Sequence, residues 1–285
     1  MSHIAIVTDT DSSLPLELAK KHNIVQVPII IQFGEESFRD VYDINNETIF
    51  ARIDKEGKLP TTAAPSPGQF MEAFKTAFDS GADSVLCLNI SSEMSATYAS
   101  ARQAAEMLPG KRIEVVDTRS LAMGQGFMVL AAAEAISNGA SIEEAVATAE
   151  EIRSRTSLFG SLATLKYIAM SGRVSHLAAG MAGLLDIKPV LTLQNGKLEL
   201  LEKIRTQRKS WNRAIELSVE KAAGRKIEKV AILNVKAPES ARQFEDLLRT
   251  ALPCPEEITF TNITPGLSVH TGAGLVAVVF VTAKE

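Results

Sequence analysis

The sequence predicts an α/β protein of two α/β domains: an N-terminal mostly parallel sheet with helices on both faces, and a C-terminal mixed sheet with helices. The chain has 285 residues, which suits two domains of ordinary size. Its first half alternates short apolar runs with helical patterns, as a parallel sheet and its connecting helices do. Its second half contains Asn195-Gly196 between two extended runs, the pattern of a β-hairpin and therefore of antiparallel pairing.

Unbroken apolar runs mark the expected strands of the first half. Strands that are covered on both faces have this character, whereas strands with one solvated face alternate between apolar and polar residues. The predicted strands are His3–Val7, Val25–Phe33, Val85–Ile90 and Ile113–Val116. Because helical patterns separate these runs, the strands are expected to pair in parallel.

The helices between these strands begin at recognisable signals. Ser66, Pro67 and Gln69 supply an N-cap, a proline at the first helical position and the partner of a capping box. One buried stripe then follows at Phe70, Phe74 and Phe78. The other predicted helices run from Met94 to Leu108, over Ala122–Ser137, and from a Ser141/Glu144 cap to about Arg155.

The second half contains shorter and less regular elements. Phe159–Lys166 fits a strand or a helix, and short helical pieces are expected around Leu165–Met170 and Leu177–Leu185. After the hairpin, the predicted elements are a helix over Thr206–Ala223, a strand over Lys229–Val235, a helix over Ser240–Ala251, and strands over Glu257–Ile263 and Leu275–Val281. We therefore predict an N-terminal domain over 1–157 and a C-terminal domain over 158–285.

Composition argues against several classes of partner. The net charge of −4, from 34 acidic and 30 basic residues, offers no basic excess for a phosphate backbone, so no nucleic acid partner is expected. No apolar run approaches the ~20 residues of a membrane-spanning helix, and the acidic, polar start of the chain does not resemble a secretory signal. Cys87 and Cys254 lie far apart and form no disulfide framework. The sequence thus predicts a cytoplasmic protein.

Hydroxyl side chains gather where the predicted strand Val85–Ile90 meets the next helix, in the segment SSEMSATY (91–98). Similar groups precede the capped helix at Thr62 and Ser66, end the first predicted strand at 8–13, and end the fourth at Asp117-Thr118. Each alone is more often a helix cap. Together they lie where an open α/β sheet binds ligands, and neutral donors with helix N–H groups suit a carboxylate better than a phosphate.

Basic candidates are few. Arg173 lies in a predicted turn, Arg205 at a strand end, and His270 in a glycine-rich loop before the last strand. Isolated residues of these kinds are more often structural. No phosphate-binding glycine motif, metal-ligand spacing or nucleophile with a paired base is present, so we predict no cofactor, no metal site and no catalytic residue.

Eight segments in order across the chain resemble the DegV family of bacterial fatty-acid-binding proteins. They are VTDTDSSLP, PTTAAPSPGQF, ISSEMSATYASA, VVDTRSLAMGQG, SGRVS, LLDIKPVL, NGKLELLEKIR and HTGAG. The resemblance implies a DegV-like fold that holds one long-chain fatty acid, its tail in a buried tunnel and its carboxylate at a polar site. It also implies a possible role as the lipid-carrying subunit of a bacterial fatty acid kinase, which presents the carboxylate to a separate ATP-dependent kinase subunit that makes acyl phosphate for phospholipid synthesis.

The resemblance carries roles onto particular positions. Thr62, Ser92, Ser95 and His270 match the residues that bind the carboxylate in the family. The two candidate arginines, Arg173 and Arg205, match positions that suit phosphate transfer or kinase docking.

The chain departs from the family motifs beside the expected head-group site. The residues that differ are Ala63, Ala64, Glu93, Met94 and Ala96. Two polar side chains are thereby lost and a bulkier, charged turn is gained, which bears on the head-group contacts and on the type of ligand.

Two other functions are compatible with the residues. One is an enzyme acting on a small carboxylate or phosphate, with His270 as base and Asp117 or Asp9 assisting. The other is an interaction protein with a vestigial pocket. The missing nucleotide and metal motifs favour lipid binding over both.

Overall fold

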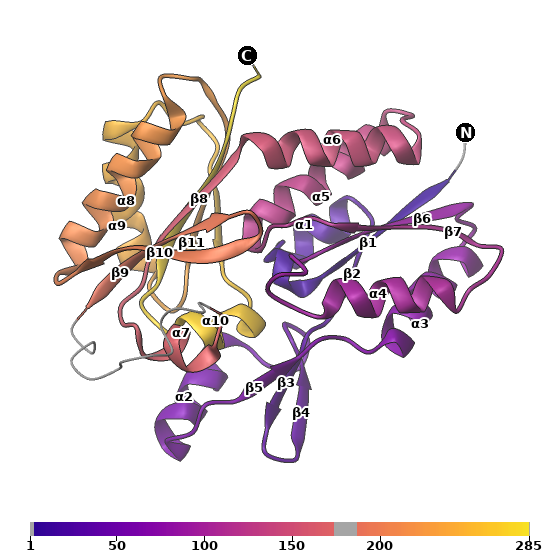
Figure 1. The fold of residues 1–285 in the computed structure, drawn as a ribbon, viewed down its shortest axis with the longest axis horizontal. Helices are drawn as coiled ribbons and strands as arrows, with labels where there is room; N and C mark the ends of the chain where they lie inside the picture. Colours follow the sequence, from indigo (N-terminus) through magenta and orange to yellow (C-terminus); the bar gives the residue numbers. More distant parts are fainter. Residues whose placement is uncertain (1–2, 174–186, 285) are drawn as a thin grey trace. The chain divides into compact units, whose positions relative to one another are not determined.

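The structure, a computed structural model, describes residues 3–173 and 187–284 (Figure 1). The chain divides into two compact units. Unit 1 comprises Met1–Asn45 and Pro60–Ser154, and unit 2 comprises Asn46–Leu59 and Arg155–Glu285. One division therefore falls close to the 157/158 boundary predicted from the sequence. The assignment of 46–59 to unit 2 has no counterpart in that prediction.

Unit 1 is built on a four-stranded parallel sheet in the order β2-β1-β6-β7, which confirms the predicted parallel pairing. Its strands are β1 (Ile4–Asp9), β2 (Ile24–Val27), β6 (Ser84–Asn89) and β7 (Arg112–Asp117). Side chains of β1 and β6 are buried on both faces, as unbroken apolar runs require.

The predicted single strand Val25–Phe33 was wrong, because it forms two strands in different sheets. β2 ends before Pro28, which has no N–H to continue the ladder. The chain then enters β3 (Ile30–Phe33), which pairs antiparallel with β4 (Glu36–Arg39) and with β5 (Thr61–Ala63). β4 and β5, and the short helix α1 (Leu16–Lys21), were not predicted.

Helices cover both faces of the parallel sheet (Figure 1). One face is covered by α3 (Pro67–Asp79) and α4 (Thr97–Glu106), whose buried side chains Phe70, Phe74, Ala101 and Ala104 share a core with Val7 and Val85. On the other lies α5 (Ala122–Ser137), whose Gln125 donates to the Thr8 hydroxyl and the Leu88 carbonyl. α6 (Ile142–Arg155) follows α5. The α5 boundaries match the prediction, whereas α4 begins later than Met94.

The predicted capping box of α3 is present. Gln69 N donates to Ser66 Oγ at 3.3 Å, and Ser66 N donates to Gln69 Oε1 at 2.9 Å. We expect Ser66→Ala to lower the free energy of unfolding by about 1 kcal/mol, because a first-turn N–H loses its acceptor. Urea denaturation would measure the loss, with Ser66→Asp as the control that restores an N-cap. An Ala variant as stable as the wild type would contradict this prediction.

Unit 2 contains a six-stranded mixed sheet in the order β10-β9-β8-β13-β11-β12, in which the neighbours β11 and β12 pair in parallel and the other neighbouring strands pair antiparallel. The strands are β8 (Thr156–Ser161), β9 (Lys188–Gln194), β10 (Lys197–Ile204), β11 (Ile227–Asn234), β12 (Thr259–Asn262) and β13 (Val276–Thr282). Asn195 and Gly196 connect β9 to β10 with φ of 50° and 82°, as a two-residue hairpin turn requires. The mixed sheet and the hairpin are thus confirmed.

The core of unit 2 lies between this sheet and the helices α8 (Gln207–Ala222) and α9 (Pro238–Ala251). Trp211 and Phe244 meet edge to face across the two helices, and Phe159 stacks with Phe280 between neighbouring strands. The ambiguous segment Phe159–Lys166 starts as β8, and α7 (Lys166–Ser171) follows, near the predicted Leu165–Met170 helix. The predicted helix Leu177–Leu185 lies outside the described residues.

Two short helices complete unit 2: α2 (Asn46–Glu56) and α10 (Pro265–Thr271). Neither was predicted. The segment expected to be a glycine-rich loop around His270 begins as α10, so that expectation was wrong. Within 3–173 and 187–284, no helix is both long and apolar enough to cross a lipid bilayer.

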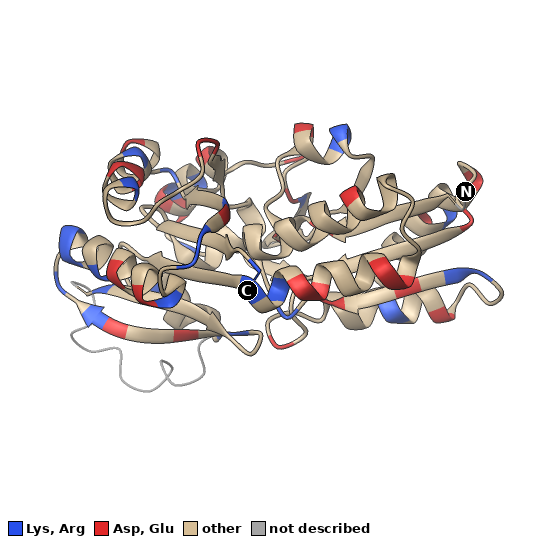
Figure 2. Ribbon diagram, turned by 90° about the horizontal axis from the view of Figure 1, so that it is seen from above, with Lys and Arg blue, Asp and Glu red and all other residues tan. Residues whose placement is uncertain are grey.

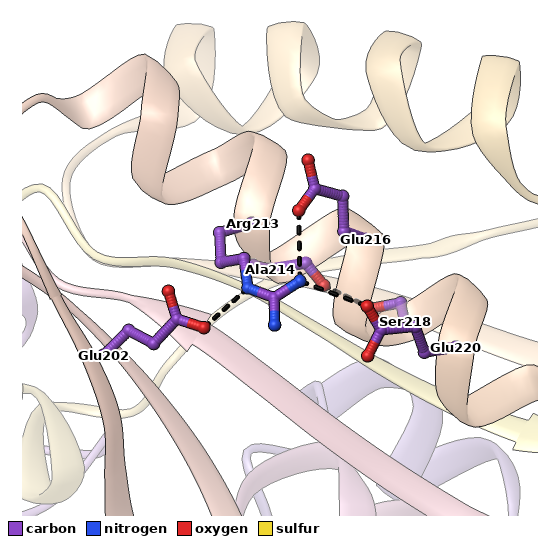
Figure 3. A network of polar contacts seen from close by, with 6 residues as sticks. All are labelled: Glu202, Arg213, Ala214, Glu216, Ser218 and Glu220. Atoms are coloured by element: carbon purple, nitrogen blue, oxygen red, sulfur yellow. Dashed lines mark hydrogen bonds and ion pairs between the residues drawn. The ribbon is translucent and has the colours of Figure 1, made fainter.

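Charged side chains lie mostly on helices, loops and outer strands, while the central strands β6 and β13 consist of uncharged residues (Figure 2). A network of ion pairs surrounds Arg213 on α8 (Figure 3). Arg213 Nε contacts Glu202 of β10 at 2.6 Å, and Nη1 contacts Glu216 and Glu220 at 3.1 Å each. These three carboxylates raise the pKa of Arg213. They also outweigh its charge, so Arg213 does not qualify as an anion-binding residue.

Candidate functional site

Polar residues end three neighbouring strands of the parallel sheet in unit 1. Asp9 ends β1, Asn89 ends β6 and Asp117 ends β7, and Asn89 stands directly beside Asp117 in the strand register. The hydroxyl-rich loop between β6 and α4, residues 90–96, starts at this edge. Carboxyl ends of parallel strands are where open α/β sheets place their ligand sites.

Asp9 is the centre of a buried hydrogen-bond network. Its Oδ2 accepts from Asn89 Nδ2 at 3.2 Å, Ile90 N at 2.8 Å and Gln125 Nε2 at 3.2 Å. Its Oδ1 accepts from Asp11 N at 3.0 Å. Asp9 has no exposed surface, and burial raises the pKa of its carboxyl to about 6 although the hydrogen bonds oppose this. The network fixes the first residue of the 90–96 loop to β1 and α5.

The Asp9 side chain also caps a helix. Asp9 caps the short 3-10 helix Thr10–Ser12 through the Asp11 amide, which confirms the capping interpretation of the Asp9/Asp11 pair. Within residues 3–173 and 187–284, no group of three or more His, Cys, Asp or Glu side chains is arranged to hold a metal ion.

Asp117 holds the other end of the same loop. Its Oδ1 accepts from Ser92 N at 3.1 Å and from Arg119 N at 2.9 Å, and its Oδ2 accepts from the Ser92 hydroxyl. Ser91 N also donates to Ser120 O at 2.8 Å. Glu93, one of the departures from the family motif, is paired with Arg119 at 3.9 Å. Each residue from Ser91 to Glu93 therefore forms a hydrogen bond or an ion pair with the segment 117–120.

Ser95 lies at the start of α4. Its Oγ accepts from Thr97 N at 3.3 Å and lies 2.8 Å from the hydroxyl of Thr97. Thr97 is fully buried, whereas Ser95 and Ser92 retain exposed surface. Ala96 precedes the first residue of α4, and its side chain cannot accept a hydrogen bond from the helix. Ser95 supplies that acceptor instead, as an N-cap residue does.

Thr62 occupies the middle of β5. It stands opposite Ile31 of β3 in an antiparallel pair, so both side chains project from the same face of that small sheet. Ile31 is fully buried and Thr62 is partly buried, which places Thr62 on the covered face, while Thr61 and Ala63 are exposed.

His270 belongs to unit 2 and is held by α10. Asn46 Nδ2 of α2 donates to Ile263 O at 2.9 Å, and Ser268 Oγ of α10 donates to Asn46 Oδ1 at 2.6 Å. Burial first, and the charge of Arg173 second, lower the pKa of His270 to about 4. The imidazole is accordingly neutral at neutral pH and offers one N–H donor and one nitrogen acceptor.

The two candidate arginines are exposed side chains of unit 2. Arg173 follows the left-handed Gly172 that ends α7, and its backbone N–H and guanidinium both turn back to Ser171. Arg205 follows β10 directly. Both stand at element ends, where a charged side chain reaches solvent.

Several residues of these networks were not singled out from the sequence. They are Asn46, Asn89 and Gln125. One signal existed for Asn89: it is a polar residue at the end of an otherwise apolar strand, as Asp9 and Asp117 are. Asn46 and Gln125 lie in helices and had no such signal.

The fold and this polar strand edge define a class of protein: two-domain α/β proteins with one parallel and one mixed sheet. A family model described as "Uncharacterised protein, DegV family" matches residues 3–283. The chain belongs to the DegV family.

Relatives and solved structures agree over the whole chain. A DegV domain-containing protein of Streptomyces coelicolor is 34% identical over 277 residues, covering 97% of this chain and 98% of the relative. A DegV family protein from Thermus thermophilus is 32% identical with a TM-score of 0.88, covering 99% of this chain and 100% of that one. DegV of Bacillus subtilis is 28% identical with a TM-score of 0.87, again covering 99% and 100%. Both solved proteins are described as fatty-acid-binding.

Proposed function

We propose that this chain binds a long-chain fatty acid, with its tail in a buried tunnel and its carboxylate oriented by neutral polar groups. The observation that carries the proposal is the likeness, over nearly the full chain, to two fatty-acid-binding DegV proteins. An acyl tail gains ~0.8 kcal/mol per methylene on leaving water, so the tail can supply most of the affinity. The head group then needs only directed donors and no buried countercharge.

In unit 1 the proposed carboxylate partners are Thr62, Ser92 and Ser95. Ser92 and Ser95 lie on the loop that Asp9 and Asp117 hold in place. Thr62 lies on the covered face of its small sheet. His270 of unit 2 is proposed as a further partner by its match to the family histidine, and its neutral state suits a hydrogen-bond donor.

The low pKa of His270 weighs against the alternative of an enzyme with His270 as base. A general base works best with a pKa near the operating pH, and about 4 lies well below neutrality. Lipid binding needs no such base, so the same imidazole fits the proposed function better.

A role as lipid-carrying subunit of a fatty acid kinase extends this proposal. It rests on the resemblance of the SGR and KIR segments to family positions near the site of phosphate transfer. The exposed side chains of Arg173 and Arg205 are accessible to a phosphate or to a kinase subunit. In this proposal the chain works in the cytoplasm and presents the fatty acid to the kinase subunit, which makes acyl phosphate for phospholipid synthesis.

Denaturing mass spectrometry of the protein purified from cells tests the binding proposal. We expect about one fatty acid per chain, and Ser95→Ala is expected to retain less than the wild type because a donor to the carboxylate is lost. Ser154→Ala, which removes a helix-surface hydroxyl that bonds to Glu151 O, is the matched control and is expected to retain a full complement. A wild-type protein that carries no fatty acid and refuses added palmitate would overturn the proposal.

A further inference from the structure

The Ser92 hydroxyl has one proton to donate, and in the structure that proton points to Asp117. An ionised carboxylate only accepts hydrogen bonds, so the contact between Ser92 Oγ and Asp117 Oδ2 is a donation by the serine. Such a bond to a charged acceptor is stronger than one between neutral groups. Ser92 cannot donate to a second carboxylate while this bond is made.

The backbone strengthens this arrangement. Asp117 Oδ1 accepts from Ser92 N at 3.1 Å, so both oxygens of one carboxylate hold both donors of one serine. Arg119 N, at 2.9 Å from the same Oδ1, fixes the carboxylate in turn. Turning the Ser92 hydroxyl towards a ligand therefore breaks one bond of a set that the backbone keeps in register.

Ser95 is placed differently. Its oxygen accepts from Thr97 N and lies 2.8 Å from the Thr97 hydroxyl, a contact in which either oxygen can be the donor. When Thr97 donates, the Ser95 proton is available to a ligand. No carboxylate of the chain contacts Ser95 in the described part of the structure.

We propose that Asp117 is a specificity-determining residue of the head-group site, which withholds Ser92 as a donor and leaves Ser95 as the main hydroxyl partner of the ligand. This inference rests on the proposed fatty acid function and narrows its proposed set of carboxylate partners, because Ser92 then contributes little in the wild type. The negative charge of Asp117 next to Ser92 also disfavours an anion there. Asp117 thereby weakens the binding of the head group, while the tail supplies most of the affinity. Weak binding of the head group suits a carboxylate that is to be phosphorylated or released.

Asp117→Asn separates these effects. The introduced amide keeps an oxygen for the N–H groups of Ser92 and Arg119, and its NH2 group donates to Ser92 Oγ, which frees the Ser92 proton. We expect the Kd for palmitate to fall about tenfold. The Kd for hexadecanol, which has the same chain and no charge, is expected to change less than twofold.

A double-mutant cycle with Ser92→Ala assigns the gain to Ser92. Alone, Ser92→Ala is expected to raise the Kd for palmitate less than threefold, because its proton is already taken. In the Asp117→Asn background the same change is expected to remove most of the gain. Palmitate binding by the wild type without a gain in Asp117→Asn would overturn this inference and leave the proposed function intact.

Other outcomes are equally decisive. If Ser92→Ala alone raises the Kd more than tenfold, Ser92 is already a principal donor and the inference is wrong. If Asp117→Asn does not fold, as judged by thermal unfolding, the Ser92→Ala arm decides alone. A wild type that neither carries fatty acid from cells nor binds palmitate overturns the proposed function, and this inference with it.

Discussion

Replacing Asp9 by alanine is expected to lower the free energy of unfolding by about 3 kcal/mol at neutral pH. The N–H groups of Asn89, Ile90 and Asp11 lose this acceptor at once. Gln125 Nε2 loses one of its three acceptors. The carboxyl has no exposed surface, so water cannot replace it without opening the strand edge. Chemical denaturation at a fixed pH measures the loss.

Asp9→Asn is the matched control. Its amide oxygen can take the Oδ2 position and keep three of the four donors, so we expect a smaller loss than for alanine. Equal losses in the two variants would show that the hydrogen bonds of Oδ2 contribute little.

Wild type and Asp9→Asn together test how the contribution of Asp9 to stability depends on pH. Its pKa is raised from 3.8 to about 6 in the folded protein, so the folded state holds this proton more tightly than the unfolded chain. The stabilising contribution of the group is fully present below about pH 4 and is lost as the pH rises through about 6. We expect the stability gap between wild type and Asp9→Asn to shift in favour of the wild type as the pH falls across that window. A gap that is constant with pH would contradict the assignment.

Loss of Asp9 is also expected to weaken ligand binding at the candidate site. Asp9 accepts the N–H of Ile90, the residue before the serines of the 90–96 loop. Without the bond to β1, the loop keeps only its contacts with residues 117–120, such as those to Asp117 and Ser120. We therefore expect Asp9→Ala to retain less palmitate than the wild type under conditions in which circular dichroism shows that the variant is still folded.

Local signals explain which parts of the fold could be predicted. The hairpin at Asn195-Gly196, the capping box at Ser66 and the helix Ala122–Ser137 depend on residues that are neighbours in sequence. The strand predicted over Val25–Phe33 was wrong because apolar character alone does not show where one strand ends and the next begins. Pro28 was the sequence signal for that break.

Long-range contacts explain what could not be predicted. The helix α2 belongs to unit 2, and its Asn46 forms hydrogen bonds with Ile263 and Ser268, which lie more than two hundred positions away in the sequence. The buried network of Asp9 likewise joins residues that are eighty or more positions apart. The sequence identified Asp9 as a cap, which is confirmed, but the contacts with Asn89 and Gln125 depend on strand order and helix packing.

Replacing Gly272 by alanine is expected to cost about 3 kcal/mol or more, through two separate effects. Gly272 follows α10 with φ 81° and ψ 162°, a backbone region that is essentially restricted to glycine. A Cβ there would also lie 2.3 Å from Cδ2 of Tyr167, whose ring packs edge to face on Phe50. Phe50 belongs to α2 and Tyr167 to α7, so a shift of the ring away from the new Cβ would disturb this contact between the two helices.

Two variants separate the backbone effect from the steric one. Gly34→Ala, at φ 60° with no atom within 4 Å of the new Cβ, is expected to cost only about 1 kcal/mol. Adding Tyr167→Ala to Gly272→Ala removes the clash and leaves the backbone strain, so the double variant is expected to lose less than the two single changes added together. Strict additivity would show that the ring does not constrain Gly272.

The functional consequence of Gly272→Ala follows from its distance to His270, two residues earlier in the chain. Gly272 N donates to Ser268 O at 2.8 Å and ends α10, the helix that carries the imidazole. A shifted α10 end moves His270 away from the position that burial and the Asn46–Ser268 bond define. We therefore expect fatty acid retention to fall in Gly272→Ala and to remain in Gly34→Ala, when both are measured below their unfolding transitions. Normal retention in folded Gly272→Ala would mean that the carboxylate does not depend on His270 for its hold.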